Sequence, residues 1–461
     1  MSMQGRSLSI IGAGPAGALL AILMQRRGIR VTLYESRSDP NLGAVERGRS
    51  INLALADRGI AALRLAGAFD LIEDALVPMR GRYVHPLEGP GTLQPYGQRA
   101  EEVIYSISRH RLTQVLLRIA ARQPGVEVKF EHRLEDADFD ARVALVRDLR
   151  RDVLLRVPMH PMVAADGAGS TMRRRMAMQG LIEADEADLE HGYKELNIAA
   201  DPAGRHRMER EALHIWPRGN FMLIALPNED GSFTATLFLP MRGAVSFASL
   251  GSAGLIEQFL SQNFPDAWRL MPQSVAQFQE NPTGFLGTVH AAPWHRDDTI
   301  ALLGDAAHAM VPFHGQGMNC CFEDCVQFDA CAARHDSWEA VFAGFYAARK
   351  PNTDAIARMA LENYREMRER VTDPGFQLQQ ALSMELERRF PQRFVPRYAM
   401  VMFHHEIPYQ TAEQRGRVQA RLLAELTEGV TSLAGVDYAR AARAIESQLA
   451  PIQDLSSVTK L

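Results

Sequence analysis

The chain has 461 residues, of which 46% are hydrophobic and 23% are charged, and its formal net charge is −4 at pH 7. This composition is typical of a globular protein with two or three domains, and the slightly negative charge argues against a nucleic-acid-binding surface. Four cysteines in so long a chain exclude a secreted disulfide scaffold. We find no uninterrupted apolar run of about 18 residues, and no signal-peptide pattern opens the sequence. We therefore expect a cytoplasmic protein without a membrane span.

The first motif lies near the N-terminus, between two expected strands. Residues 8–11 (LSII) and 30–34 (RVTLY) have strand patterns, and a helical segment lies between them. Gly12, Gly14 and Gly17 follow the first strand with the spacing GxGxxG. In a strand–helix–strand unit such glycines permit a tight turn, the close approach of a pyrophosphate and close packing of the helix on the strand. This context predicts a dinucleotide site, and a merely Gly-rich turn is the other interpretation.

An acidic residue ends the second expected strand. Glu35 lies 18 residues after Gly17, where a carboxylate can accept hydrogen bonds from the ribose hydroxyls of an adenosine. A carboxylate there repels a 2′-phosphate, which disfavours NADP and leaves NAD and FAD. Arg37 is placed to reach adenine or a phosphate, although a solvated arginine explains it equally well.

Two arginines near residue 80 are candidates for binding a carboxylate. Arg80 and Arg82 alternate along the segment MRGRYVHP, so in a strand both side chains would lie on one face. Either guanidinium could form two hydrogen bonds with a carboxylate, and a surface arginine is the other interpretation. Residues 88–101 are rich in Gly, Pro and Gln and predict a loop with Tyr96 at its tip.

A strand is predicted to change into a helix within residues 105–117. Ser108 is a suitable N-cap, and Arg109 lies in the first helical turn. Arg109 could therefore point at a pyrophosphate or a flavin, and a solvated arginine is the other interpretation.

Two further acidic residues follow apolar strand patterns. Asp166 begins the segment DGAGSTMR, in which Ser170 opens a helix, and Asp305 follows the strand pattern of residues 298–303. Asp305 is suited to hold a sugar-like hydroxyl. The helix expected after Gly317 directs its N–H groups and partial positive charge at an electron-rich ligand. For Asp166, a well-capped strand–helix turn is the other interpretation.

The middle and the end of the chain differ in pattern from the beginning. Residues 191–290 contain short strand patterns and a hairpin around residues 227–231, which predicts an inserted antiparallel sheet. On these strands Ile224, Leu226 and Phe238 could line a pocket or belong to the core. Helices are predicted from residue 338 onward, and their Ala/Leu/Arg-rich end suits internal packing or a homodimer contact.

The four cysteines cluster on one expected helix. Cys321 and Cys325 are four residues apart, and none of the four forms a CxxC pair. Because structural zinc sites use such pairs, we predict small buried helix residues and no metal.

Three motifs in a fixed order support a family resemblance. GxGxxG, the pair Asp166-Gly167 and the pair Gly304-Asp305 resemble those of the single-component FAD-dependent aromatic hydroxylases. The segments RSINLAL, MRGRYVH, QPYG, EVIYSISR, GDAAHAMVPFHGQGMNCCFEDC and ALENYREMR further resemble the kynurenine-hydroxylating members of that family, over nearly the whole chain. Residues 456–461 (SSVTKL) are polar, unlike the C-terminal membrane anchor of eukaryotic members, so we expect a bacterial-type protein.

The resemblance implies an α/β fold with a Rossmann-like FAD-binding domain, an inserted antiparallel-sheet substrate domain and a C-terminal helical cap. We predict the first part of the FAD domain at residues 1–190, the substrate domain at 191–290, the return of the FAD domain with a long helix at 291–370, and the helical domain covering the substrate site at 371–461.

The resemblance also implies the reaction. An FAD enzyme would use NADPH and O₂, through a flavin hydroperoxide, to convert L-kynurenine into 3-hydroxy-L-kynurenine in tryptophan degradation. No second GxGxxG unit is present, so NADPH is expected to bind transiently as a co-substrate. The ring amine already activates the substrate, so no dedicated catalytic base is expected, and His314 is assigned a packing or polar-contact role. One alternative function is a related hydroxylase that acts on another aromatic substrate, and a second is a non-catalytic, GDI-like binding protein. A tryptophan halogenase is disfavoured because the motif GWxWxIP is missing.

The motifs and the resemblance together assign residues to two ligands. For the carboxylate of the substrate the resemblance selects Arg82, rather than Arg80, and Tyr96. The cofactor-binding residues are Gly12, Gly14, Ala16, Gly17, Glu35, Arg37, Ala54, Arg109, Leu134, Asp166, Asp305, Gly317, Met318 and Asn319. The substrate-binding residues are Arg82, Tyr96, Asn363, Tyr398, Phe238, Leu226, Ile224, Pro312, Phe313 and His314.

Overall fold

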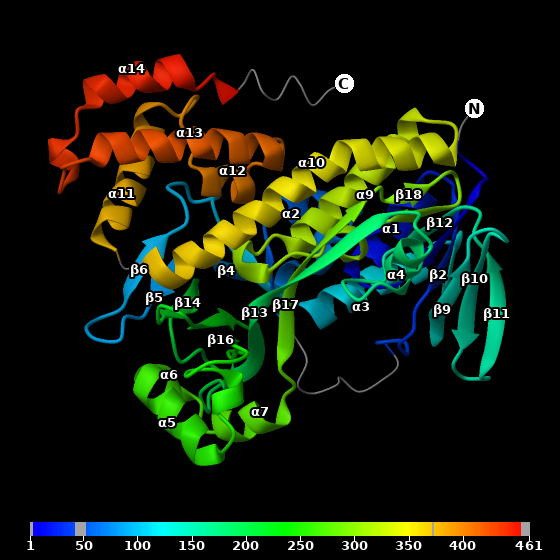
Figure 1. The fold of residues 1–461 in the computed structure, drawn as a ribbon, viewed down its shortest axis with the longest axis horizontal. Coiled ribbons are helices and arrows are strands. Elements are labelled where there is room, and N and C mark those ends of the chain that lie inside the picture. Colours follow the sequence, from blue (N-terminus) through cyan, green and yellow to red (C-terminus); the bar gives the residue numbers. More distant parts are fainter. Residues whose placement is uncertain (1–2, 42–51, 371–372, 453–461) are drawn as a thin grey trace. The chain divides into compact units, whose positions relative to one another are not determined.

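The computed structural model describes residues 3–41, 52–370 and 373–452 (Figure 1). The start of the RSINLAL segment and the C-terminal tail at 456–461 lie outside these ranges. The described chain divides into two compact units, each assembled from three separated segments. Unit 1 contains residues 1–76, 107–189 and 286–357, and unit 2 contains residues 77–106, 190–285 and 358–461. The division into domain segments at 1–190, 191–290, 291–370 and 371–461, made from the sequence, stays a prediction.

Unit 1 is built on a six-stranded sheet in the order β18-β19-β12-β1-β2-β8. Its inner strands pair in parallel, as expected for a Rossmann-like sheet with helical crossovers. Only β18 pairs in the antiparallel direction. The strands are β1 (Ser7–Ile11), β2 (Arg30–Tyr34), β8 (Val126–Lys129), β12 (Met162–Ala164), β18 (His295–Arg296) and β19 (Ile300–Leu302).

Helix α1 (Pro15–Arg26) follows β1 directly and is almost entirely apolar. Its residues 17–24 are all buried, because α3 (Arg109–Ala121) and α9 (Gly317–Arg334) pack against it. This burial confirms the strand–helix–strand unit predicted around the glycine motif. The other helices and strands of unit 1 are β3 (Asn52–Leu55), α2 (Asp57–Leu65), β9 (His132–Asp138), β10 (Val143–Asp148), β11 (Val153–Pro158), α4 (Thr171–Met178) and α8 (Asp305–His308).

Unit 2 contains most of a seven-stranded sheet in the order β17-β13-β16-β15-β14-β5-β6. The predicted hairpin is present as β15 (Met222–Pro227) and β16 (Phe233–Pro240), which pair antiparallel. Leu223, Ala225 and Leu237 belong to a core formed with the helices α5–α7. The remaining elements here are β4 (Val77–Met79), β5 (Gly81–Val84), β6 (Thr92–Pro95), β14 (Ala212–Pro217), α5 (Ala253–Asn263), α6 (Pro265–Leu270) and α7 (Ser274–Glu280). Three strands contain residues of both units: β7 (Ile104–Ser108), β13 (Glu183–Ile198) and β17 (Gly284–Ala292).

The C-terminal part is helical, as predicted. Helix α10 (Trp338–Arg365) belongs to unit 1 up to residue 357 and then to unit 2. The other four helices are α11 (Pro374–Arg389), α12 (Arg397–Phe403), α13 (Tyr409–Thr427) and α14 (Tyr438–Gln448).

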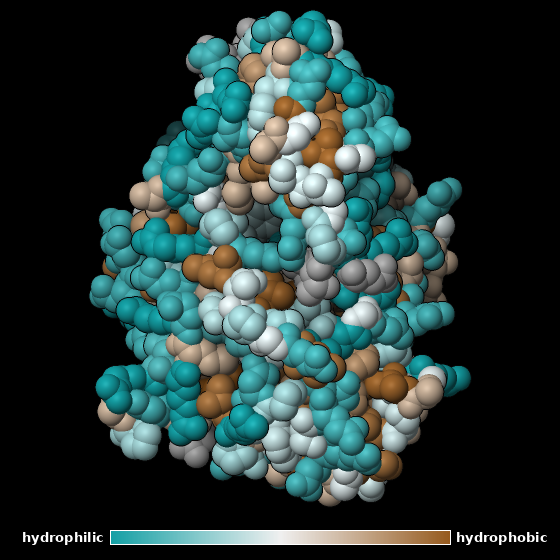
Figure 2. Space-filling view, turned by 90° about the vertical axis from the view of Figure 1, so that its left-hand side faces the viewer, coloured by the Kyte–Doolittle hydropathy of each residue, from teal (hydrophilic) through white to brown (hydrophobic). Residues whose placement is uncertain are grey.

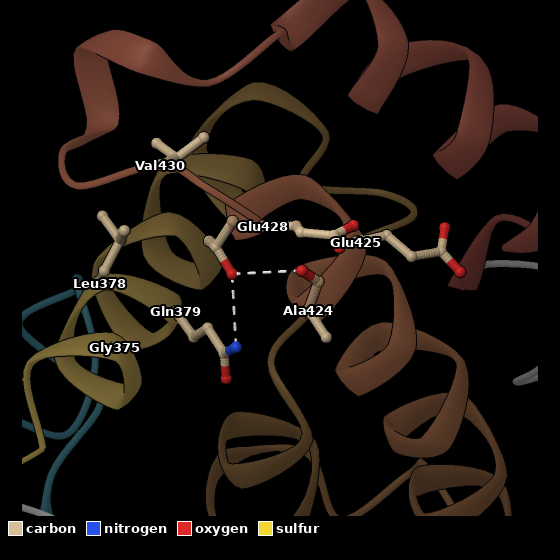
Figure 3. A pocket seen from close by; sticks show the side chains of 8 residues that line it. Gly375, Leu378, Gln379, Ala424, Glu425, Glu428 and Val430 are labelled. Atoms are coloured by element: carbon tan, nitrogen blue, oxygen red, sulfur yellow. Dashed lines mark hydrogen bonds between the residues drawn. The ribbon is translucent and has the colours of Figure 1, made fainter.

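The apolar faces of the last helices serve internal packing. Leu382, Leu386, Leu422 and Ile445 form a buried cluster there. Beside this cluster a shallow pocket lies between α11 and α13 (Figure 3). Gln379 Nε2 donates to Thr427 Oγ1 at 3.3 Å, which joins the two helices at this pocket.

The surface shows no large apolar area on the face drawn in Figure 2. Hydrophilic residues predominate there, and hydrophobic residues form small, separate groups. Within the described residues, no helix combines the length and the apolar character that crossing a membrane requires.

Two predictions near residue 80 were wrong. Arg80 does not share a strand face with Arg82, because it lies between β4 and β5, where its exposed side chain pairs with Glu211 Oε2 at 2.8 Å. The segment at 88–101 is not simply a loop, because it contains β6. Tyr96 follows this strand and is only 9% exposed, so it is not at an exposed tip.

A partly buried chain of hydrogen bonds supports the sheet of unit 2. The carbonyl oxygen of Glu209 lies 2.8 Å from His214 Nε2, and His214 Nδ1 lies 2.8 Å from His85 Nε2. His85 Nδ1 lies 2.8 Å from Asp266 Oδ2. The carbonyl needs a donor, so His214 carries its proton on Nε2 and accepts from His85 at Nδ1. Burial lowers the pKa of His214 to about 4, which keeps it neutral.

This histidine makes acid pH destabilising. As the pH falls from 6.5 towards 4, His214 takes up a proton in the unfolded chain but not in the folded one. The free energy of unfolding therefore keeps this contribution above pH 6.5 and loses it progressively as the pH falls towards 4. We expect a loss of up to about 3 kcal/mol across this window. Urea unfolding midpoints at pH 6.5, 5.5 and 4.5 measure it. The His214→Gln variant should be less stable at pH 6.5 but should lose less on acidification; parallel curves for the two proteins would contradict the assignment.

Candidate functional site

The three glycines of the motif in unit 1 serve two purposes. Gly12 and Gly17 lie against backbone atoms of the protein, whereas Gly14 faces open space. A Cβ on Gly17 would lie 1.9 Å from the carbonyl oxygen of Gly12, and a Cβ on Gly12, where φ is +96°, would lie 2.4 Å from that of Ala165. A Cβ on Gly14 would meet no atom within 4 Å. Gly12 and Gly17 therefore permit close packing, and Gly14 leaves the N-terminus of α1 open to an anion. Ala16 lies in the first turn of this helix.

Glu35 is buried just after β2 and is held in place by hydrogen bonds from neighbouring residues. Its carboxylate accepts from the Ala13 N–H at 2.9 Å, from the Arg37 N–H at 2.9 Å and from Arg37 Nε at 2.9 Å. Burial would raise the pKa of Glu35, but the hydrogen bonds and charge of Arg37 outweigh it and lower the pKa below its ordinary value. The ionised carboxylate is thus available to ribose hydroxyls, and Arg37 folds back onto it.

Asp166 presents a buried oxygen without a protein donor. Its Oδ2 accepts from the Met172 N–H at 3.2 Å, whereas Oδ1 has no hydrogen-bond partner in the part of the chain that the structure describes. Ser170 caps α4, as predicted, by accepting from the Arg173 N–H at 2.9 Å. A buried acceptor without a donor costs free energy unless a ligand supplies one. Asp166 Oδ1 therefore suits a hydroxyl-bearing ligand.

Asp305 begins α8, and Gly304 before it has a φ of +65°, a conformation that favours glycine. Further on, Gly317 begins the long helix α9, and a Cβ there would meet no atom within 4 Å. The turn before α8 thus carries a carboxylate, and the first N–H groups of α9 are ones that a helix leaves without an intrahelical acceptor. Met318 lies in the first turn of α9.

The side chain of Asn319 is occupied by the protein itself. Its Oδ1 accepts from the Ala56 N–H at 2.9 Å, and its Nδ2 donates to the carbonyls of Ala54 at 2.8 Å and Gly315 at 2.9 Å. Asn319 therefore fixes two loops at the start of α9, and its backbone N–H is the group it can offer to a cofactor.

The remaining cofactor candidates lie at the surface or in strands of unit 1. Arg109 is exposed at the start of α3, where Ser108 is the N-cap. Leu134 is buried in β9, and Ala54 is partly buried in β3. Together, the open Gly14, the donorless Asp166 oxygen and the ionised Glu35 fit a dinucleotide that carries ribose and ribityl hydroxyls, as FAD does.

In unit 2, two predicted substrate residues, Tyr96 and Tyr398, lie around the guanidinium of a third, Arg82. The rings of Tyr96 and Tyr398 stack with centroids 5.2 Å apart. The Arg82 guanidinium carbon lies 5.7 Å from the ring centroid of Tyr96 and 5.3 Å from that of Tyr398. Burial would lower the pKa of Arg82, but Tyr398, Tyr96 and the Glu366 carboxylate together raise it, so the guanidinium stays charged. Burial raises the pKa of both tyrosines, which keeps their hydroxyls protonated as donors.

The strand register of unit 2 places further candidates on one sheet face. Arg82 pairs with Leu213, Ile215 with Ile224, and Met222 with Phe238. Paired residues share a face, and side chains alternate along a strand. Arg82, Ile224, Leu226 and Phe238 therefore lie on the face opposite the core with α5–α7. Asn363, buried in α10, donates from Nδ2 to the Met367 sulfur at 3.3 Å.

The last three substrate candidates belong to unit 1. Pro312, Phe313 and His314 form a single 3₁₀ turn that ends at Gly315, where φ is +66°. Phe313 and His314 are buried. The candidate residues are therefore divided between the two units.

The predicted burial of the cysteines on α9 is confirmed, because all four are buried, and none forms a disulfide. Burial raises the pKa of the thiols of Cys320, Cys321 and Cys325, which disfavours the thiolate needed for metal binding. The sequence reasoning missed the role of Glu366 beside Arg82, although its position three residues after Asn363 on a helix was a usable signal.

Known proteins similar to this chain agree with these features. The family model described as "FAD binding domain" matches residues 6–329. A kynurenine 3-monooxygenase of Stenotrophomonas maltophilia (strain K279a) is 50% identical, over 96% of this chain and 97% of its own length. A kynurenine 3-monooxygenase of Xanthomonas campestris pv. campestris (strain 8004) is 48% identical, over 97% of this chain and 98% of its own length.

A solved structure supports the fold. The tetrameric form of 2-methyl-3-hydroxypyridine-5-carboxylic acid oxygenase aligns with a TM-score of 0.65 and 19% identity, covering 83% of this chain and 97% of its own. The predicted fold class and family resemblance are confirmed. With FAD-site geometry in unit 1 and close relatives over nearly its full length, the chain belongs to the kynurenine 3-monooxygenase family of FAD-dependent monooxygenases.

Proposed function

We propose that this protein hydroxylates L-kynurenine to 3-hydroxy-L-kynurenine, with FAD as cofactor and NADPH and O₂ as co-substrates. The observation that carries the proposal is the Arg82–Tyr96–Tyr398 cluster of unit 2. It occurs in a chain that is 50% identical to a kynurenine 3-monooxygenase. In the overall reaction NADPH supplies two electrons, one oxygen atom enters the ring, and the other leaves as water.

The cluster suits a carboxylate. Arg82 provides a fixed, partly desolvated positive charge, and the two protonated tyrosines provide neutral donors beside it. Hydrogen bonds between a guanidinium and a carboxylate are charge-assisted and can be bidentate. A carboxylate ligand is therefore the natural complement of this guanidinium.

The neighbouring charge favours an amino acid over a simple acid. The carboxylate of Glu366 acts on Arg82 from the start of a π-helical turn at Glu366–Arg370. A positive and a negative group close together match the carboxylate and the ammonium of an α-amino acid. The apolar residues Ile224 and Phe238, on the same sheet face as Arg82, suit an aromatic ring.

For the cofactor, we assign the ribose to Glu35, the pyrophosphate to the turn at Gly14, and the ribityl chain to Asp305 and Asp166. When bound, FAD supplies the redox chemistry, accepting electrons from NADPH and activating O₂. The protein's own residues bind, orient and exclude water. Since the amine of the substrate donates electron density to the ring, no base is assigned, and His314 is given a packing role.

Two further assignments belong to this proposal. We assign the protein to the cytoplasm. A reducing compartment supplies the NADPH that the reaction consumes, and it suits four buried cysteines that form no disulfide. A homodimer is compatible with the helical C-terminus, and light scattering on the purified protein would measure it.

The decisive assay separates binding from chemistry. L-Kynurenine should accelerate NADPH oxidation by the FAD-loaded protein and yield 3-hydroxykynurenine in step with NADPH consumed, as identified by chromatography. Anthranilate, which has the aromatic amine but lacks the amino-acid side chain, is the matched control and should stimulate much less. NADPH oxidation without a hydroxylated product, or equal turnover of anthranilate, would refute the proposed substrate.

A further inference from the structure

A buried ionic network lies behind the turn that carries Asp305. Asp324, in α9, is completely buried, and its carboxylate accepts from three directions. Arg349 Nε lies 2.7 Å from Oδ1, His308 Nε2 lies 2.5 Å from Oδ2, and the Gly304 N–H donates to Oδ2 at 3.2 Å. All these residues belong to unit 1.

The network continues away from the turn. Arg349 Nη1 also pairs with Glu323 Oε2 at 2.9 Å, and Glu323 Oε1 pairs with Arg58 Nη1 at 2.9 Å. The network thus links α2, α9, α10 and the turn before α8. Burial would raise the pKa of Asp324, but the charges of His308 and Arg349 lower it, so Asp324 is a carboxylate.

The contact with Gly304 sets this carboxylate apart from an ordinary structural ion pair. Gly304 directly precedes Asp305, and its φ of +65° places its N–H towards Asp324. A Cβ on Gly304 would lie 3.1 Å from the Cys321 sulfur, so the turn is also confined from that side. The position of the Asp305 backbone is therefore set by a fixed, charged acceptor.

We propose that Asp324 is a positioning residue for FAD: through the Gly304 N–H it holds Asp305 in the orientation that the ribityl chain requires. This inference rests on the proposed role of Asp305 but not on the identity of the substrate. Preorganised groups bind more tightly because less ordering is left for the binding step. No other carboxylate contacts this turn among the hydrogen bonds and ion pairs found in the described ranges.

The Asp324→Asn variant tests the proposal. An amide in the same place can still accept from Arg349, but its NH₂ group cannot also accept from Gly304 and His308. We expect FAD to bind the apoprotein roughly ten- to a hundredfold more weakly, as for the loss of a hydrogen bond to a charged group. Loss of the negative charge should also shift the two-electron potential of the reconstituted flavin to a more positive value, which a purely structural defect would not do.

Two controls separate positioning from general stability. Asp329→Asn removes another ion pair of α9, in which Asp329 Oδ1 lies 2.5 Å from Arg27 Nε, and it should leave FAD affinity unchanged. The double variant Asp324→Leu/Arg349→Met replaces both charges of the buried pair by apolar side chains, so we expect its apoprotein unfolding midpoint to lie closer to wild type than that of Asp324→Asn. Its FAD affinity should remain low, because a leucine side chain cannot accept a hydrogen bond from Gly304.

The outcomes are distinguishable. FAD titration by fluorescence on the full-length apoprotein and thermal unfolding of the same samples are the measurements. Wild-type FAD affinity in the double variant, or affinity that follows the unfolding midpoint across all variants, would overturn the proposal. If the wild-type protein failed to hydroxylate kynurenine while Asp324→Asn still weakened FAD binding, the proposed function would fall and this inference would stand.

Discussion

Replacing Arg82 by alanine is expected to weaken L-kynurenine binding by roughly thirty- to several-thousandfold, since truncating one partner of a buried, hydrogen-bonded charge pair costs about 2–5 kcal/mol. The variant removes the guanidinium around which Tyr96 and Tyr398 lie, and leaves the substrate carboxylate without its counter-charge. The apparent KM for kynurenine and its dissociation constant, from the change in flavin absorbance, measure the effect. The rate with saturating substrate should fall less than the affinity.

Arg80 provides a matched control for this experiment. It is two residues away, carries the same charge and lies at the surface, where it pairs with Glu211. Arg80→Ala should therefore leave the KM nearly unchanged, because exposed ion pairs contribute about 0–1 kcal/mol. Tyr96→Phe, which removes one neutral donor, should weaken binding by about tenfold. Equal KM values for the Arg80 and Arg82 variants would disprove the carboxylate role.

Adding one methyl group at Gly14 or at Gly17 is expected to weaken FAD binding for two different reasons. In Gly14→Ala the new Cβ enters space that no protein atom occupies, so the apoprotein should unfold as wild type does. That space is the one we assign to the pyrophosphate, and we expect roughly hundredfold weaker FAD binding, which corresponds to a steric cost within the usual 1–3 kcal/mol of overpacking.

In Gly17→Ala the new Cβ would lie 1.9 Å from the Gly12 carbonyl oxygen, so β1 and α1 must separate. Both FAD affinity and the stability of the apoprotein should fall. Thermal unfolding of the two apoproteins, combined with FAD titration, distinguishes the cases. A Gly14→Ala protein that binds FAD as wild type does would mean that the pyrophosphate does not approach this turn.

The parts of the fold that the sequence predicted well are those with a local cause. The strand at residues 30–34, the N-caps Ser108 and Ser170 and the hairpin around 227–231 depend on residues a few positions apart. Their patterns of apolar, capping and turn residues are complete within a short window. The glycine motif belongs to the same class.

Tyr96 shows why other parts could not be predicted. The strand before it, β6, lies at an edge of the sheet and is mostly exposed, so Thr92–Pro95 carries no alternating pattern. Nothing in the local sequence indicates that the next residue turns inward and stacks on Tyr398. That contact joins residues about 300 positions apart and exists only once β5, β6 and α12 are assembled.

The assigned roles of Asn319 and Asp324 illustrate a second limit. The sequence selected Asn319 for direct cofactor contact, but its side chain is bonded to backbone groups as much as 265 residues away. Asp324 received no assignment, because an acidic residue in the middle of a helix usually faces solvent. Its importance follows from partners on three other elements, which only the folded chain brings together.

The alternation of segments between the two units has a consequence for biosynthesis. Strand β19 and helix α9, which complete the FAD-binding unit, are synthesised only after more than half of the chain, including most of the sheet of unit 2. A ribosome-bound chain cannot form the Gly304–Asp305 turn or its Asp324 support until then. Contacts between such distant segments form slowly and leave unpaired strand edges exposed meanwhile. The nascent protein should therefore depend on chaperones for longer than one whose domains are completed in sequence, and cofactor loading should be a late step.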